Sequence, residues 1–165
     1  MTTVGGSEEN LLGTEMLIAL ASGDRQQIDE RMRSLLAVKS SIGFINVIHK
    51  RMWELLDDPQ RAIAELKQMA ADPRAQSAII QGAIIPQWAA ALGDPEFALV
   101  GWSKLPMPVQ RGYAIALWRP VYKNMRKLDG FKDLVRQMGL ADYWRKTSHW
   151  ADDCHPVGDN DFECE

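Results

Sequence analysis

Residues 91–99 read A-L-G-D-P-E-F-A-L: one helical segment stops at a glycine, and the next starts at Asp94-Pro95. An aspartate side chain accepts hydrogen bonds from the first free N–H groups of a helix, and a proline at the first helical position has no N–H to lose. The same arrangement recurs at Asp58, again followed by proline, and at Asp24 after a glycine. The sequence therefore predicts three similar helix starts.

The three starts are 34 and 36 residues apart. A period near 34 residues is typical of tetratricopeptide repeats, whose helical hairpins stack because none buries its apolar face alone. We predict an all-α, tetratricopeptide-like α-α superhelix (solenoid) of about three hairpins plus C-terminal capping helices and an irregular tail. An irregular helical bundle with evenly spaced caps is the alternative. Superposing the starts aligns Ile28, Ala62 and Ala98, then Met32, Leu66 and Trp102, then Leu35, Met69 and Leu105.

Each predicted start is preceded by another helical segment, which completes a hairpin. Pro86 lies inside one of these segments and should kink or split it, because proline has no N–H to donate. Alternating strand patterns and Asn-Gly hairpin turns are absent from the sequence. The expected pairs are Glu15–Ala21 with Asp24–Val38, Ile42–Leu56 with Pro59–Ala71, and Ala75–Leu92 with Pro95–Leu105.

The remaining segments complete the expected organisation. Residues 1–13 are polar and Gly-rich and predict a flexible N-terminal arm before the helical repeat domain over residues 14–147. Residues 108–147 should close the stack, with one helix starting at Pro120 and another ending at Gly139. Residues 148–165 lack a helical period and predict an acidic irregular tail packed on the domain.

Bulk composition indicates a single globular domain. The chain has 165 residues, 46% hydrophobic content and a net charge of −3. No apolar run approaches the ~18 residues of a membrane span, and the N-terminus has no secretory pattern. We therefore expect a cytoplasmic protein, with no membrane insertion by this chain.

Motifs of catalysis are absent from the sequence. It contains no Gly-rich phosphate loop, no G-x-S-x-G and no H-E-x-x-H. His49, followed by Lys50 and Arg51, predicts a half-exposed helix edge rather than a catalytic residue. We expect a protein that is not an enzyme and needs no cofactor.

The tail holds the densest group of reactive side chains, and three interpretations of it stay open. Cys154 and Cys164 could form a disulfide, or remain as two buried thiols. A zinc site would add His149 and His155, but this spacing is not a known ligand pattern. Calcium binding by acidic residues of the tail is weaker still, because no EF-hand glycine or closing glutamate is placed correctly.

A basic segment precedes this acidic tail. Residues 104–146 hold 10 Lys/Arg and 3 Asp/Glu, a net of +7, whereas residues 147–165 hold 0 and 6, a net of −6. We favour folding of the tail back onto the basic segment over a plain solvated face, and we do not expect a nucleic-acid partner. The tryptophans at positions 53, 88, 102 and 118 fall at helical spacing and predict core positions, whereas those at 144 and 150 could hold the tail.

The C-terminal residues resemble a known family. The runs G-F-K-D-L-V-R-Q-M-G-L-A-D-Y-W-R-K-T at 130–147 and W-A-D-D-C-H-P-V-G-D-N-D-F-E-C at 150–164 are similar to the end of bacterial tetratricopeptide-like transcription regulators with an N-terminal winged helix. The winged helix and the membrane span of some members are absent here, so DNA binding does not carry over. The resemblance implies a sensing or protein-contact role, and in a membrane-anchored regulator a periplasmic location where a Cys154–Cys164 disulfide is reasonable.

We hypothesise a non-catalytic protein-interaction or sensing module of a bacterial regulator, which binds a protein or peptide segment on the solenoid surface. The first helices of the hairpins would form a concave binding face. Candidate contacts are His49, Lys50, Gln81 and Gln87. The alternative is a small-molecule sensor with a buried pocket between helices, near Trp88, Trp102 and Trp118.

Overall fold

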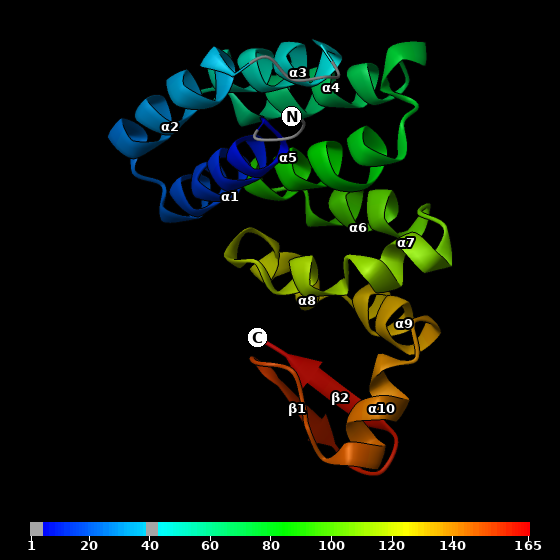
Figure 1. The fold of residues 1–165 in the computed structure, drawn as a ribbon. Helices are drawn as coiled ribbons and strands as arrows, with labels where there is room; N and C mark the ends of the chain where they lie inside the picture. Colours follow the sequence, from blue (N-terminus) through cyan, green and yellow to red (C-terminus); the bar gives the residue numbers. More distant parts are fainter. Residues whose placement is uncertain (1–4, 39–42) are drawn as a thin grey trace.

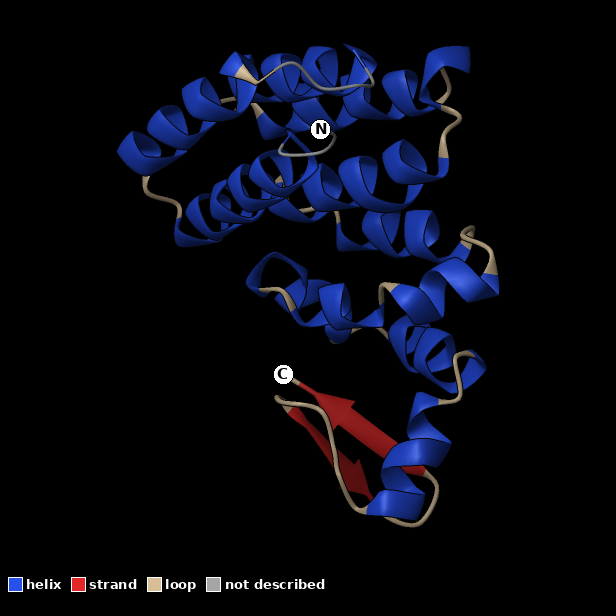
Figure 2. Ribbon diagram, viewed as in Figure 1, coloured by secondary structure: helices blue, strands red, loops and turns tan. Residues whose placement is uncertain are grey.

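Helices make up most of the protein, as the all-α prediction requires. The computed structural model describes residues 5–38 and 43–165, which contain ten α-helices and one small two-stranded sheet. Helices α1–α6 lie together in one part of the molecule, and the sheet lies at the far end, beside α10 (Figures 1 and 2).

The first six helices follow the predicted hairpins. Each helix packs against the next along the chain. Helix α1 also contacts α5 and the short 3-10 turn η4 (Pro120–Tyr122), so the N-terminal helix faces elements that lie far from it in sequence. The helices are α1 (Gly5–Ser22), α2 (Arg25–Ala37), α3 (Gly43–Glu54), α4 (Pro59–Ala70), α5 (Ile85–Ala91) and α6 (Pro95–Ser103).

The three predicted helix starts are confirmed by their hydrogen bonds. Each aspartate side chain accepts from a backbone N–H two or three residues ahead, at 3.0 Å for Asp24, 3.2 Å for Asp58 and 2.9 Å for Asp94. Of the nine apolar positions aligned by the repeat, eight are buried and Met69 is half-buried. The cap and the apolar face therefore repeat together.

The predicted helix over residues 75–92 starts later and is irregular. A 3-10 turn η1 (Pro73–Ala75) precedes it, and from residue 78 the helix runs without a break through a π-helical turn η2 (Ile80–Ile84) into α5. The π-helical turn lies just before Pro86, which cannot donate to the preceding turn, so the proline accompanies a distortion of the helix rather than a split. A Cβ on Gly82 would collide with Leu105, so this turn can approach the end of α6 only with glycine there.

The flexible arm expected over residues 1–13 needs correction. Helix α1 begins at Gly5, so residues 5–13 are its first turns, and residues 1–4 lie outside the described part of the chain. Residues 11–22 of α1 carry the buried side chains Met16, Leu17 and Ala19. Tertiary contact outweighs the weak local helix signal of a Gly-rich segment.

The closing region is built of short helices. The expected start at Pro120 is the turn η4, and Gly139 has a φ of 79° between two helices, as its predicted capping role requires. The elements are α7 (Met107–Gly112), the 3-10 turn η3 (Ala114–Trp118), α8 (Lys123–Arg126), α9 (Asp129–Gln137) and α10 (Leu140–Thr147).

The tail is a β-hairpin, which corrects the expected irregular segment. Strands β1 (Cys154–Val157) and β2 (Asp161–Cys164) pair antiparallel, with Cys154 opposite Cys164. The two cysteines form a disulfide, so the ends of the hairpin are joined. Four-residue strands are too short to give a clear alternating pattern, although Phe162 and Cys164 do alternate inward.

The hairpin packs on the closing helices. Phe162 meets Trp144 edge to face, with ring centroids 5.6 Å apart. Asp161 pairs with Lys132 at 2.9 Å and with Arg136 at 2.8 Å, so the acidic tail does fold back onto the basic segment. Arg126, 3% exposed, also contacts the hairpin through Asp153 and the carbonyl of Glu165.

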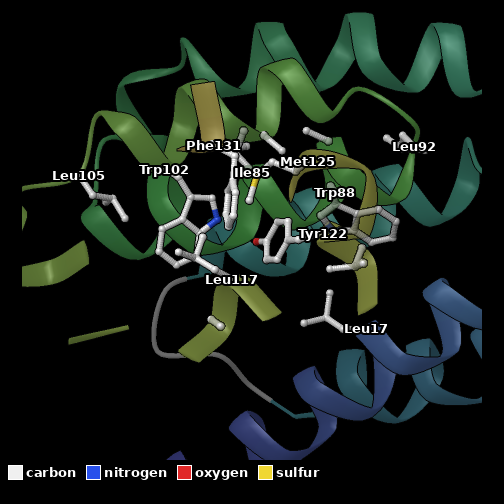
Figure 3. Packing of buried hydrophobic residues seen from close by; sticks show 14 of the residues in the cluster. Leu17, Ile85, Trp88, Leu92, Trp102, Leu105, Leu117, Tyr122, Met125 and Phe131 are labelled. Carbon is white, nitrogen blue, oxygen red and sulfur yellow. The ribbon is translucent and has the colours of Figure 1, made fainter. Parts of the chain in front are cut away.

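One hydrophobic core runs through the helices. Trp88, Trp102, Tyr122 and Phe131 lie at its centre, between α5, α6 and the turn before α8 (Figure 3). Within the described ranges, no helix combines the length and the apolar character needed to cross a bilayer.

Candidate functional site

A cleft of about 470 Å³ lies between the helices. One wall comes mainly from the first helix of each hairpin: residues 13–17 of α1, residues 45–49 of α3, and residues 78–87, which run through η2 into α5. Leu35 of α2 also lines the cleft. The other wall comes from residues 102–119, which span the end of α6, α7 and η3. The contact of α1 with α5 and η4 brings these walls together.

The cleft is lined mainly by apolar side chains, and some of the exposed side chains that line it are apolar as well. Met16, Leu17 and Leu105 lie in it with their side chains otherwise buried. Ile79 and Tyr113 also line it but are 53% and 63% exposed. An apolar pocket with a few polar groups is the default candidate for a binding site.

His49 lines this cleft and is held by a hydrogen bond to its ring. The indole N–H of Trp88 donates to its Nδ1 at 3.0 Å, so Nδ1 is the acceptor and Nε2 carries the proton. Nε2 has no hydrogen-bond partner in the described part of the chain and is not fully enclosed, while the residue lines the cleft and is 4% exposed. Burial lowers the pKa of His49 to about 4, so its Nε2–H is a neutral donor near pH 7.

The only formally charged side chain among the described lining residues belongs to Arg119. Its guanidinium makes no ion pair or hydrogen bond with any described residue, and Gln87 also lines the cleft without a side-chain hydrogen bond there. Asn46 donates to the carbonyl of Val38 at 3.3 Å. The described lining thus offers donors and a cation, without a carboxylate.

The four predicted partner contacts separate in the structure. Gln87 and His49 line the cleft. Gln81 is engaged internally, because its amide donates to the carbonyls of Ala70 at 2.8 Å and Ala75 at 3.1 Å. Lys50 is exposed and lies outside the cleft lining.

The half-exposed position expected for His49 is wrong. The side chain turns inward, because the buried indole of Trp88 needs an acceptor and His49 supplies it. Lys50 and Arg51 gave the misleading signal, since one helical step of rotation separates an inward from an outward side chain.

Sequence reasoning missed Gly13, Tyr113 and Arg119 as cleft residues. Gly13 has open space where a Cβ would stand, so its lack of a side chain helps to form the cavity. Tyr113 and Arg119 belong to short turns without helical periodicity, so no pattern pointed to them. Of the three tryptophans expected at a pocket, Trp102 lines this cleft, whereas Trp88 and Trp118 do not.

Beneath the cleft, the Trp102 ring meets Tyr122 edge to face with centroids 6.0 Å apart. The indole nitrogen and the phenolic oxygen point toward one another without reaching hydrogen-bond geometry (Figure 3). Burial raises the pKa of the Tyr122 hydroxyl, which stays protonated. We interpret this pair as part of the core that supports the cleft wall.

The reactive group in the tail is accounted for by the disulfide. Cys154 and Cys164 are bonded to one another, so neither sulfur is a thiolate ligand. In the ranges 5–38 and 43–165, no three His, Cys, Asp or Glu side chains are grouped closely enough to hold a metal ion.

Compared with family models, curated proteins and solved structures, the chain matches none of them.

Proposed function

We propose that this protein is a non-catalytic interaction module whose cleft holds a peptide segment of a partner protein. The observation that carries the proposal is the apolar cleft formed by the first helices of the three hairpins, with Ile79 and Tyr113 exposed beside it. A stack of hairpins in a tetratricopeptide-like solenoid would present its inner helices in this way.

Residues 130–164, which resemble the end of bacterial tetratricopeptide-like regulators, suggest the context. In such a protein the module would be the sensing or protein-contact part, and occupation of the cleft would be the sensed event. The capping helices and the disulfide-closed hairpin would then serve to end the stack.

The proposal is tested by selecting from a random dodecapeptide display library on the whole chain. Gly13→Leu is the blocking variant, because Gly13 lines the cleft and a Cβ there meets open space. Gly112→Leu is the matched control, since a Cβ there also meets nothing within 4 Å and Gly112 does not line the cleft. Circular dichroism and thermal unfolding would verify that both variants fold.

We expect peptides that bind the wild type and Gly112→Leu but not folded Gly13→Leu. If repeated selections give no peptide with this cleft dependence, the proposed function is wrong.

A small-molecule sensor is the second candidate, because the cleft volume of about 470 Å³ falls in the usual range for such sites. Thermal shift against a panel of apolar metabolites, repeated with Gly13→Leu, tests it. A cleft-dependent shift of several degrees without any selected peptide would favour this candidate.

A further inference from the structure

We propose that the peptide segment held by the cleft carries an acidic side chain among apolar ones, and that Arg119 binds its carboxylate. This inference rests on the proposed function and adds the chemistry of the occupant. It follows from the charge and hydrogen-bonding character of the cleft, taken in three steps.

The first step is the polar inventory of the cleft. His49 contributes a neutral Nε2–H, because Trp88 fixes its tautomer through Nδ1. Arg119 contributes a guanidinium, and none of the described lining residues is Asp or Glu. An arginine fork and a further donor in the same cleft match a carboxylate, which accepts several hydrogen bonds at once.

The second step is that the Arg119 guanidinium has no ion-pair partner among the described residues. Most other arginines of the described chain form ion pairs with carboxylates, as Arg51 does with Glu65 and Arg25 with Asp29. Arg119 is half-buried and has no ion pair among the described residues. A partly buried charge pair attracts more strongly than an exposed one, because fewer waters and ions screen it.

The third step is the electrostatic character of the wall that carries Arg119. Residues 102–119 hold the three cationic side chains Lys104, Arg111 and Arg119 and no Asp or Glu. None of the three is in an ion pair with a described residue. This wall attracts an acidic segment and disfavours a basic one.

The apolar part of the segment is required by the rest of the lining. Met16, Leu17 and Leu105 offer no hydrogen bonds, so an occupant of uniformly polar sequence would lose its hydration without compensation. A segment that places apolar side chains in the cleft and one carboxylate at Arg119 matches both the apolar lining and the cation.

The test uses the cleft-dependent dodecapeptides from the library described above. We expect them to be enriched in Asp or Glu over Lys or Arg within an apolar sequence. Replacing the Glu of a selected peptide by Gln should weaken binding about tenfold, as expected for loss of a charge-assisted hydrogen bond. Arg119→Gln should weaken binding of the acidic peptide similarly and leave the Gln peptide unaffected.

Arg111→Gln is the matched control. It removes a cation of the same wall that is exposed and does not line the cleft, so it should change the affinity little beyond a salt-dependent effect.

The outcomes distinguish failure of this inference from failure of the proposed function. Cleft-dependent peptides without acidic enrichment, or acidic peptides insensitive to Arg119→Gln, overturn this inference and leave the proposed function standing. Absence of any cleft-dependent peptide overturns both. In a parallel arm, decanoate and decanol are tested by thermal shift. Arg119-dependent binding of decanoate with no selected peptide would move the carboxylate from a peptide to a small molecule and overturn the peptide assignment.

Discussion

The indole N–H of Trp88 in α5 donates to Nδ1 of His49 in α3 over 3.0 Å. Both side chains are buried, and the bond joins two helices that contribute to the same wall of the cleft. It fixes the histidine tautomer, so that Nε2 carries the proton. One hydrogen bond therefore contributes to the packing of the helices and to the character of the site.

The free energy of unfolding should decrease as the pH is lowered, because His49 is buried as a neutral side chain. Its folded pKa of about 4 lies below the usual 6.5, so the unfolded chain binds the extra proton and the contribution is lost as pH falls from about 6.5 to 4. The expected loss is about 3 kcal/mol. Urea unfolding at neutral pH and near pH 4 would measure it for the wild type, for His49→Asn and for the exposed-histidine control His149→Asn. Identical pH dependence in all three proteins would contradict the prediction.

Removing the acceptor should strand the donor. His49→Leu leaves the buried indole N–H of Trp88 without a partner, at an expected cost of about 1–3 kcal/mol. Trp88→Phe removes the donor as well, so the double variant should be more stable than the sum of the single losses predicts. A double-mutant cycle from urea unfolding gives the coupling energy directly. A coupling near zero would show that the bond contributes nothing to stability.

Gly82 should not tolerate a side chain. In Gly82→Ala the new methyl group would overlap Leu105, and the expected cost is about 1–3 kcal/mol. Leu105→Ala creates a cavity by itself but should relieve the clash, so it should cost less in the Gly82→Ala background. Gly112→Ala is the control, since its methyl group meets open space. Equal thermal stability of the Gly82 and Gly112 variants would be evidence against the close approach.

Reducing the disulfide should loosen the hairpin. The bond between Cys154 and Cys164 has a sequence separation of 10, and closing such a loop stabilises by about 3 kcal/mol in the chain-entropy account. We expect faster hydrogen exchange in β1 and β2 after treatment with a phosphine reductant. The double variant Cys154→Ser/Cys164→Ser should show this behaviour without reductant and no further response. Unchanged exchange on reduction would mean that aromatic packing alone holds the hairpin.

Among the polar side chains of the C-terminal region, Arg126 should be the one whose removal lowers the stability most. Its guanidinium donates to the carbonyls of Leu117 and Arg119, both at 3.3 Å, and to Asp153 and Glu165, both at 3.2 Å. Arg126→Met should lower the free energy of unfolding by about 2–3 kcal/mol, since several of these partners lose their donor. The exposed neighbour Lys127→Met should lower it far less. Chemical denaturation of the two variants decides between them, and equal losses would refute the role of Arg126.

The sequence by itself determined the three capped helix starts and the order of the hairpins around them. Asp24, Asp58 and Asp94 mark helix starts through local hydrogen bonds, and the apolar positions behind them repeat with the helical period. Such signals depend on residues a few positions apart, so they can be read without the fold. The irregular turn of the helix before Pro86 was predictable for the same reason.

Only the tertiary structure decided where the cleft lies and which side chains face it. Gly13, His49 and Arg119 come from segments far apart in sequence, and they share one cavity because α1 closes onto α5 and η4. The inward turn of His49 depends on the buried Trp88, and the hairpin depends on the aromatic surface of α10. These features arise from contacts between distant segments, whose energies exceed local preferences and leave no local pattern.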